Sequence, residues 1–158
     1  MSNIPPEVTM HRDSRPLIDR VAASTGNVLL VVGRILIGGL YVWSGYAKLT
    51  DIGGFAAMLG ASGLPLASLL APIAAALEFG AGVAIVLGLG TRYAALALIA
   101  FTAAAALIAH RFWQSPPDQQ LNQTIHFAKN VAIIGGFVFV FVTGGGHLSL
   151  DRLMRGHR

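Results

Sequence analysis

The apolar positions along the chain fall into four long runs, separated by short segments that are polar or rich in glycine. The runs cover residues 28–47, 69–89, 93–110 and 125–142. Each is close to the ~20 residues that an α-helix needs to cross the hydrocarbon core of a bilayer. Backbone polar groups in lipid must be satisfied within the segment, so these runs predict helices. The pattern predicts an all-α integral membrane protein, a four-helix bundle formed by residues 28–143.

Two of the connecting segments carry structural information of their own. Residues 50–64 are too short and too rich in glycine to span a bilayer, which predicts a re-entrant or interfacial segment after the first span. Its apolar side is expected to carry Phe55, Met58 and Leu59. Residues 114–124 contain two prolines among polar side chains and are expected to form a loop.

Polar tails flank the predicted bundle. Residues 1–27 form the N-terminal tail, in which an amphipathic helix is expected to lie on the membrane surface. Its apolar side consists of Leu17, Ile18 and Val21, and its basic side of Arg15 and Arg20. Residues 144–158 form a basic C-terminal tail.

The distribution of positive charge predicts the topology. Lys and Arg number three in the N-terminal tail, one (Arg92) in the turn between the second and third runs, and three in the C-terminal tail, against three near the opposite surface. Because cytoplasmic segments of membrane proteins are enriched in Lys and Arg, both termini are expected in the cytoplasm.

Composition excludes several classes of function. The chain is 54% hydrophobic and 11% charged, where globular domains carry about 25% charged residues, so a soluble enzyme is not expected. The net charge of +4 is not gathered into a basic stripe, which argues against binding to nucleic acid. Cysteine is absent, so the side chains offer no thiol, disulfide or iron–sulfur chemistry.

Glu78 lies near the middle of the second apolar run. A central charge in a membrane costs about 2.5–3.5 kcal/mol on insertion scales, so this carboxylate needs a partner or a function. Helical spacing places mostly small residues on its face, which lets another helix approach closely: Ala71, Ala74, Ala75, Ala81, Gly82 and Ile85. Glu78 is either a hydrogen-bonded contact between helices or a site that handles protons or a ligand.

The other polar residues of the spans are expected to meet above Glu78, in the outer half of the bundle. Lys48, His110, His126, Lys129 and Asn130 lie toward that half, and either Lys129 or Lys48 is the expected partner of Glu78. Neither histidine has an HxxxH or HxxE spacing, so no metal site is predicted. Both lie near span ends, which argues against haem ligation.

The candidate residues fall into three groups. The candidate catalytic residues are Glu78, Lys129, His110 and His126. The candidate ligand-binding residues are Arg34, Tyr41, Lys48 and Asn130. Arg92 and Asp151 are assigned to structure and topology.

An ordered set of short motifs resembles the DoxX family of small four-helix membrane proteins. The motifs are Gly33-Arg34-Ile35, Gly45-Tyr46-Ala47-Lys48-Leu49, Leu77-Glu78-Phe79-Gly80-Ala81-Gly82, Gly90-Thr91-Arg92, and Gly144-Gly145-Gly146-His147-Leu148-Ser149-Leu150-Asp151. They cover about residues 28–153, and the family pattern marks Arg34, Lys48, Glu78, Arg92 and His110 here. The resemblance implies a membrane subunit linked to quinone redox chemistry. One branch of the family is similar to the small subunit of thiosulfate:quinone oxidoreductases, but the lack of cysteine argues against a direct sulfur-relay role for this chain.

The expected function is therefore a quinone-linked oxidoreductase subunit in the inner membrane of a bacterium. Quinone is the candidate cofactor, and membrane lipids, a partner redox subunit or a second copy of the chain are the candidate partners. Two alternatives remain open: a structural subunit that anchors other proteins, and a small proton-coupled carrier that depends on Glu78.

Overall fold

The computed structural model describes residues 16–156, in which the chain is helical and contains no strand. Its elements are α1 (Leu17–Thr50), α2 (Ile52–Ala61), α3 (Ala67–Leu87), α4 (Thr91–Ala109), a short 3-10 helix η1 (Phe112–Gln114), α5 (Pro117–Thr143) and α6 (Leu150–Arg155). Among these residues, four helical segments are long and apolar enough to cross a membrane: α1, α3, α4 with η1, and α5. The predicted all-α class with four spans is confirmed.

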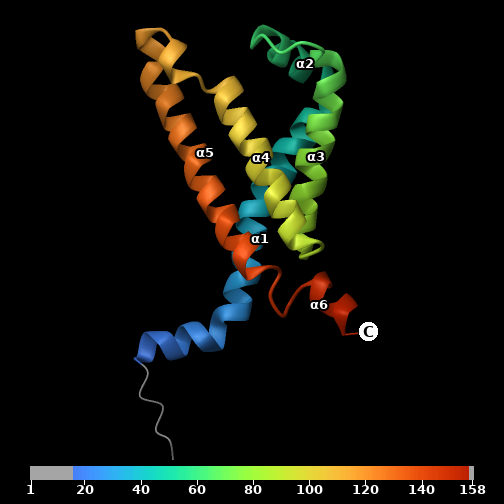
Figure 1. Cartoon of the computed structure of the whole chain (residues 1–158), viewed down its shortest axis with the longest axis vertical. Helices are drawn as coiled ribbons and strands as arrows, with labels where there is room; N and C mark the ends of the chain where they lie inside the picture. The colour runs from blue at the N-terminus through green and yellow to red at the C-terminus, as the bar shows by residue number, and fades with distance from the viewer. Residues whose placement is uncertain (1–15, 157–158) are drawn as a thin grey trace, which may run out of the picture.

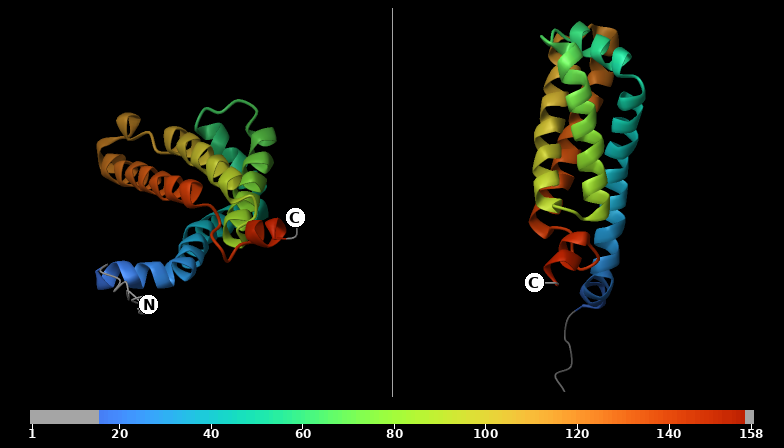
Figure 2. Two further views of the ribbon diagram at one scale, coloured as in Figure 1. Left: turned by 60° about the horizontal axis from the view of Figure 1, so that its bottom comes forward. Right: turned by 90° about the vertical axis from the view of Figure 1, so that its right-hand side faces the viewer.

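The four long helices run alongside one another as a bundle (Figure 1; Figure 2). α1 packs mainly on α3, α5 mainly on α4, and α3 and α4 join the two pairs. We call the two ends of the bundle the α2 end, which also carries η1, and the terminal end, where α1 begins and α6 lies (Figure 1). The central core is built from Tyr41, Ile85, Ala94, Ala95, Leu98 and Phe137.

Glycines bring the backbones of α1 and α3 into direct contact. A Cβ atom added to Gly45 would lie 2.6 Å from the backbone nitrogen of Phe79, and one added to Gly82 would lie 2.9 Å from that of Val42. Ala71 and Ala75 are fully buried farther along the same face of α3. The Gly82 end of the small-residue face predicted around Glu78 therefore lies in the seam between α1 and α3, while its Ala71 and Ala75 end packs against α2.

Substituting Gly45 with alanine is expected to force this seam apart. The new methyl group meets backbone atoms that cannot move aside, so we expect a loss of about 1–3 kcal/mol in the free energy of unfolding. Gly39→Ala is the matched control, because nothing lies within 4 Å of its added Cβ, and it should be neutral or slightly stabilising. Thermal unfolding in detergent compares the two, and equal stability would contradict the close contact.

α1 begins well before the predicted first span. Pro16 precedes its first turn with φ −52°, and Asp19 in that turn carries the sign of charge that a helix N-terminus favours. The turns that contain Leu17 and Ile18 are exposed and run at a steep angle to the rest of α1 (Figure 1). Arg15 and the rest of the predicted tail before residue 16 lie outside the described residues.

The segment after the first span forms α2, which packs on α3 at the α2 end of the bundle (Figure 1). The Asp51 carboxylate accepts a hydrogen bond from the Gly54 backbone N–H at 2.9 Å and so caps its first turn. Phe55 and Leu59 pack against the alanines of α3. Met58, which was also expected on the apolar side, is 47% exposed and does not join this contact with α3.

Most of the loop predicted for residues 114–124 belongs to α5. Pro117 occupies the first turn of that helix, where its missing N–H costs nothing, and Asp118 follows it there. The polar composition of these residues therefore marks a helix that continues beyond the apolar run, and not a loop.

Candidate functional site

A cavity of about 220 Å³ lies among the four long helices toward the α2 end, and we call it the polar pocket. It gathers seven of the candidate residues. From α1 and α3 these are Tyr41, Lys48 and Glu78; from the end of α4 and from α5 they are His110, His126, Lys129 and Asn130. The structure places these seven around one cavity, while the roles assigned to them stay predictions.

Glu78 and Lys48 form an ion pair inside the polar pocket. Lys48 Nζ donates to Glu78 Oε2 at 2.5 Å and to Ser44 Oγ at 3.0 Å. The Glu78 side chain is 3% exposed and that of Lys48 is 25% exposed. The Lys48 ammonium also lies 5.3 Å and 5.7 Å from the ring centroids of Phe55 and Phe101. Of the two expected partners of Glu78, the structure selects Lys48.

Tyr41 is held on the pocket wall by a chain of hydrogen bonds. The Thr102 hydroxyl donates to the Leu98 carbonyl at 2.6 Å, so the Tyr41 hydroxyl is the donor in its 2.5 Å contact with Thr102 Oγ1. Its ring packs edge-on against Phe137, with centroids 5.2 Å apart. Sequence reasoning missed Thr102, although a threonine in the middle of an alanine-rich span was the available signal.

His110 and His126 stack at the rim of the pocket, with ring centroids 5.0 Å apart and planes 13° apart. His110 Nδ1 lies 2.9 Å from Gln123 Oε1, an acceptor, which assigns the proton to Nδ1. Lys129 Nζ donates to His126 Nδ1 at 3.2 Å, so that nitrogen carries no proton and Nε2 is the N–H of the neutral ring. The rim therefore offers one imidazole acceptor and one imidazole donor.

Arg34, which was grouped with the candidate ligand-binding residues, does not line the polar pocket and lies away from it. Fourteen residues separate it from Lys48 on α1, or about 21 Å along the helix axis. Arg34 is 3% exposed, and its guanidinium donates from Nη2 to the Leu148 carbonyl at 2.6 Å. Nε and Nη1 have no hydrogen-bond partner among the described residues. Arg34 thus anchors the segment that leads into α6.

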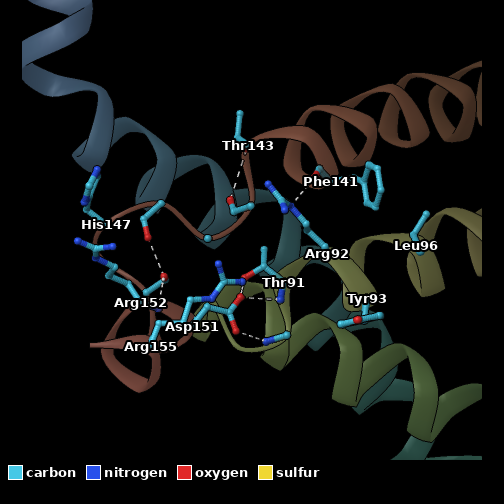
Figure 3. Close-up of a pocket in the computed structure, with 15 residues that line it drawn as sticks. Thr91, Arg92, Tyr93, Leu96, Phe141, Thr143, His147, Asp151, Arg152 and Arg155 are labelled. Atoms are coloured by element: carbon cyan, nitrogen blue, oxygen red, sulfur yellow. Dashed lines mark hydrogen bonds between the residues drawn. The ribbon is translucent and has the colours of Figure 1, made fainter. Parts of the chain in front are cut away.

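Asp151 binds the start of α4 at the terminal end (Figure 3). Its carboxylate accepts hydrogen bonds from the backbone N–H groups of Gly90 and Thr91, at 2.7 Å and 2.9 Å, and from the Thr91 hydroxyl at 2.8 Å. Burial alone raises the pKa of Asp151, but these hydrogen bonds and the charge of Arg155 outweigh burial and hold the pKa below its ordinary value. Asp151 therefore caps a helix distant in sequence.

Arg92 makes the matching contact with α5. Its Nε donates to the Phe141 carbonyl at 3.1 Å (Figure 3). Its Nη2 donates to the Val142 carbonyl at 3.3 Å. These carbonyls belong to the last turn of α5, where a cation is favourable. Arg92 and Asp151 thus join the α4 N-terminus to α5 and α6.

Replacing Asp151 with asparagine is expected to have an effect that depends on pH. Because its folded-state pKa is lowered, the carboxylate stabilises the fold above its ordinary pKa of 3.8, and this contribution is lost as the pH falls through the folded-state value. At pH 7 we expect Asp151→Asn to be less stable by about 1–2 kcal/mol, with a difference that shrinks in acid. Thermal unfolding of both proteins, measured from neutral to acidic pH, gives this difference in stability.

Asp118→Asn is the control for that experiment, since Asp118 lies in the first turn of α5. It should lose only the interaction with the helix dipole, at most about 1 kcal/mol. A stability difference for Asp151→Asn that stays constant from neutral to acidic pH would contradict the assigned contacts.

Comparison with known proteins places the chain among small membrane proteins. The DoxX family model matches residues 29–111. Inner membrane protein YphA of Escherichia coli K12 is 36% identical over 125 residues, which cover 79% of this chain and 89% of that protein. Inner membrane protein YqjF of the same organism is 36% identical over 128 residues, covering 81% and 93%. No solved structure matches the chain.

Proposed function

Because the chain belongs to the DoxX family, we propose that it is an inner-membrane subunit of a quinone-linked oxidoreductase, with the polar pocket as its quinone site. The observation that carries this proposal is the convergence of a buried Lys48–Glu78 pair, an aromatic wall and two hydrogen-bonding imidazoles on one cavity. A quinone ring requires flat apolar walls and a few donors aimed at its carbonyl oxygens.

The size of the pocket suits a headgroup alone. Its volume of about 220 Å³ is below the roughly 300–1,000 Å³ of pockets that enclose a whole drug-sized ligand. The ring would occupy the cavity while the isoprenoid tail stays among the lipids. Phe101 and Leu40, which line the pocket, supply apolar surface for the ring.

The polar groups are placed to hold the two carbonyls and to move protons. Reduction of a bound quinone takes up two electrons and two protons and yields the quinol. Lys48, at the floor, and the Nε2–H of His126, at the rim, are the proton-bearing donors. Glu78 balances the Lys48 charge, and Lys129 and Asn130 extend the rim.

The electrons must come from a partner redox subunit, because none of the side chains that line the pocket can donate two electrons to a quinone. The proposal therefore includes a reductant or dehydrogenase that docks at the bundle. A structural role is the rival assignment, and one observation favours it: the Glu78–Lys48 pair is already complete as a contact between α1 and α3.

A binding titration with a short-chain quinone tests the proposal. The purified full-length protein should bind it saturably, as followed by quenching of aromatic fluorescence. Lys129→Gln, which replaces the positive charge at the rim by a neutral amide, should weaken binding by about tenfold, the difference between a charged and a neutral hydrogen bond. Arg111→Gln is the control, because Arg111 lies at the same end without lining the pocket. No saturable binding, or equal weakening by both variants, would overturn it.

A further inference from the structure

A second and larger cavity, of about 480 Å³, lies at the terminal end, where α4 begins and α5 ends. The glycine-rich connection from α5 to α6 borders it, and α6 covers one side (Figure 3). We call it the basic pocket. The proposed quinone site does not account for it, because the polar pocket lies toward the other end of the bundle.

Positive charge dominates its lining. Arg92, Arg152 and Arg155 all line the basic pocket, together with His147 (Figure 3). Asp151 is the single acidic residue among the described lining residues, and both of its oxygens are already occupied by Gly90 and Thr91. The carboxylate is thus committed to the α4 N-terminus, and the three arginines leave the cavity with a net positive charge.

One of these arginines is held in position before any ligand binds. Arg92 is fixed by its two hydrogen bonds to the last carbonyls of α5, which occupy Nε and Nη2 and leave Nη1 available. A guanidinium held in this way loses little conformational entropy when it binds an oxyanion. Arg152 and Arg155 project from α6 and supply further donors of the geometry that phosphate oxygens prefer.

The other side of the basic pocket is apolar and leads into the membrane-spanning surface. Tyr93 and Leu96 of α4 and Phe141 of α5 line it and are 83%, 47% and 37% exposed. A free phosphate would use only the arginines and leave this surface bare. A molecule with an anionic phosphate head and an apolar tail would use both parts.

We propose that the basic pocket binds the headgroup of an anionic phospholipid. The phosphodiester contacts Arg92, Arg152 and Arg155, and an acyl chain lies along Leu96 and Phe141. The terminal end is the one where positive residues predict the cytoplasmic leaflet, and basic pockets between helices on that side are suited to anionic lipid headgroups. Bound lipid would hold α6 against α4 and α5.

The test is a titration of the purified full-length protein in neutral detergent. Phosphatidylglycerol, phosphatidylcholine with the same chains, and inorganic phosphate are added separately, and thermal unfolding and lipid retention in native mass spectrometry are measured. We expect phosphatidylglycerol to raise the Tm and to be retained, with little effect of the other two.

Variants locate the site. Removing Arg152 and Arg155 together (Arg152→Gln with Arg155→Gln) should weaken phosphatidylglycerol binding by about thirtyfold, or about fivefold for each charge. Arg20→Gln is the matched control, since Arg20 lies in the described part of α1, is exposed and does not line the pocket. The pair Arg152→Lys with Arg155→Lys keeps the charge, so it should retain most of the affinity and serves if the glutamine pair does not fold.

Three results would overturn the proposal. Equal stabilisation by phosphatidylcholine would show that charge does not matter. Inorganic phosphate as effective as phosphatidylglycerol would assign the pocket to a free phosphate and not to a lipid. If Arg20→Gln weakened binding as much as the double glutamine variant does, the lipid would be attracted by the positive charge of the protein in general and not by the basic pocket.

Discussion

Replacing Lys48 with methionine is expected to destabilise the protein by about 3–5 kcal/mol, because it leaves the buried Glu78 carboxylate without its counter-charge. Methionine keeps much of the lysine stem and its contact with Phe55 and Phe101, so the loss reports on the charge. The measurement is the free energy of unfolding in detergent or bicelles.

Two further variants separate the ion pair from general packing. The double variant Lys48→Met with Glu78→Gln removes both charges and should recover a large part of the lost stability. Lys129→Met, which removes the other lysine of the polar pocket, should cost much less, because Lys129 is exposed and its described polar contact is with His126. A loss for Lys129→Met equal to that for Lys48→Met would contradict the assigned pairing.

Gly88→Ala is expected to cost about 2–5 kcal/mol, the sum of a strained backbone and a steric clash. Gly88 has φ +69°, and an added Cβ would run into the Arg34 guanidinium and lie 2.6 Å from Ser149 Cβ. The clash should push the segment before α6 away from Arg34, and this segment should then become exposed to protease. Thermal unfolding and limited proteolysis measure the two effects.

Gly90→Ala is the matched control for this glycine. Gly90 also has a positive φ, of +53°, but nothing lies within 4 Å of its added Cβ. It should therefore show only the conformational cost, about 1–2 kcal/mol. If both variants lost the same stability, the close approach of Arg34 and Ser149 to Gly88 would be contradicted.

The number of spans was predictable because four separate apolar runs of membrane-spanning length leave few other folds. Helix ends were less so. The pair of prolines before Asp118 has the composition of a turn, yet proline in the first turn and an early carboxylate start α5 there. Composition alone does not distinguish these two uses of proline.

The polar pocket was predictable in membership but not in pairing. Helix rise places Lys48, Glu78, His110 and Lys129 at related depths, which is why the sequence indicates one cluster. Which lysine reaches Glu78 depends on how the helices are rotated about their axes, and this is set by the glycine contacts between α1 and α3. Periodicity within a single helix carries no such information.

The contacts at the terminal end were beyond sequence reasoning for a different reason. Asp151 reaches Gly90 and Thr91 across about sixty positions of the chain, through a glycine-rich connection whose path no local pattern specifies. Arg34 is a related case, because its charge in a span suggested ligand binding, whereas its observed partner is a backbone carbonyl of the segment before α6.

The most direct test of the central claim is to measure quinone in the gently purified protein by mass spectrometry of organic extracts. Ala105 lines the polar pocket, so Ala105→Leu should fill the cavity while leaving the Lys48–Glu78 pair intact. Ala104 is exposed on the same helix and does not line the pocket, which makes Ala104→Leu the control. We expect near-stoichiometric quinone in the wild type and in Ala104→Leu, and its loss in Ala105→Leu. Equal quinone in all three, or none in the wild type, would contradict it.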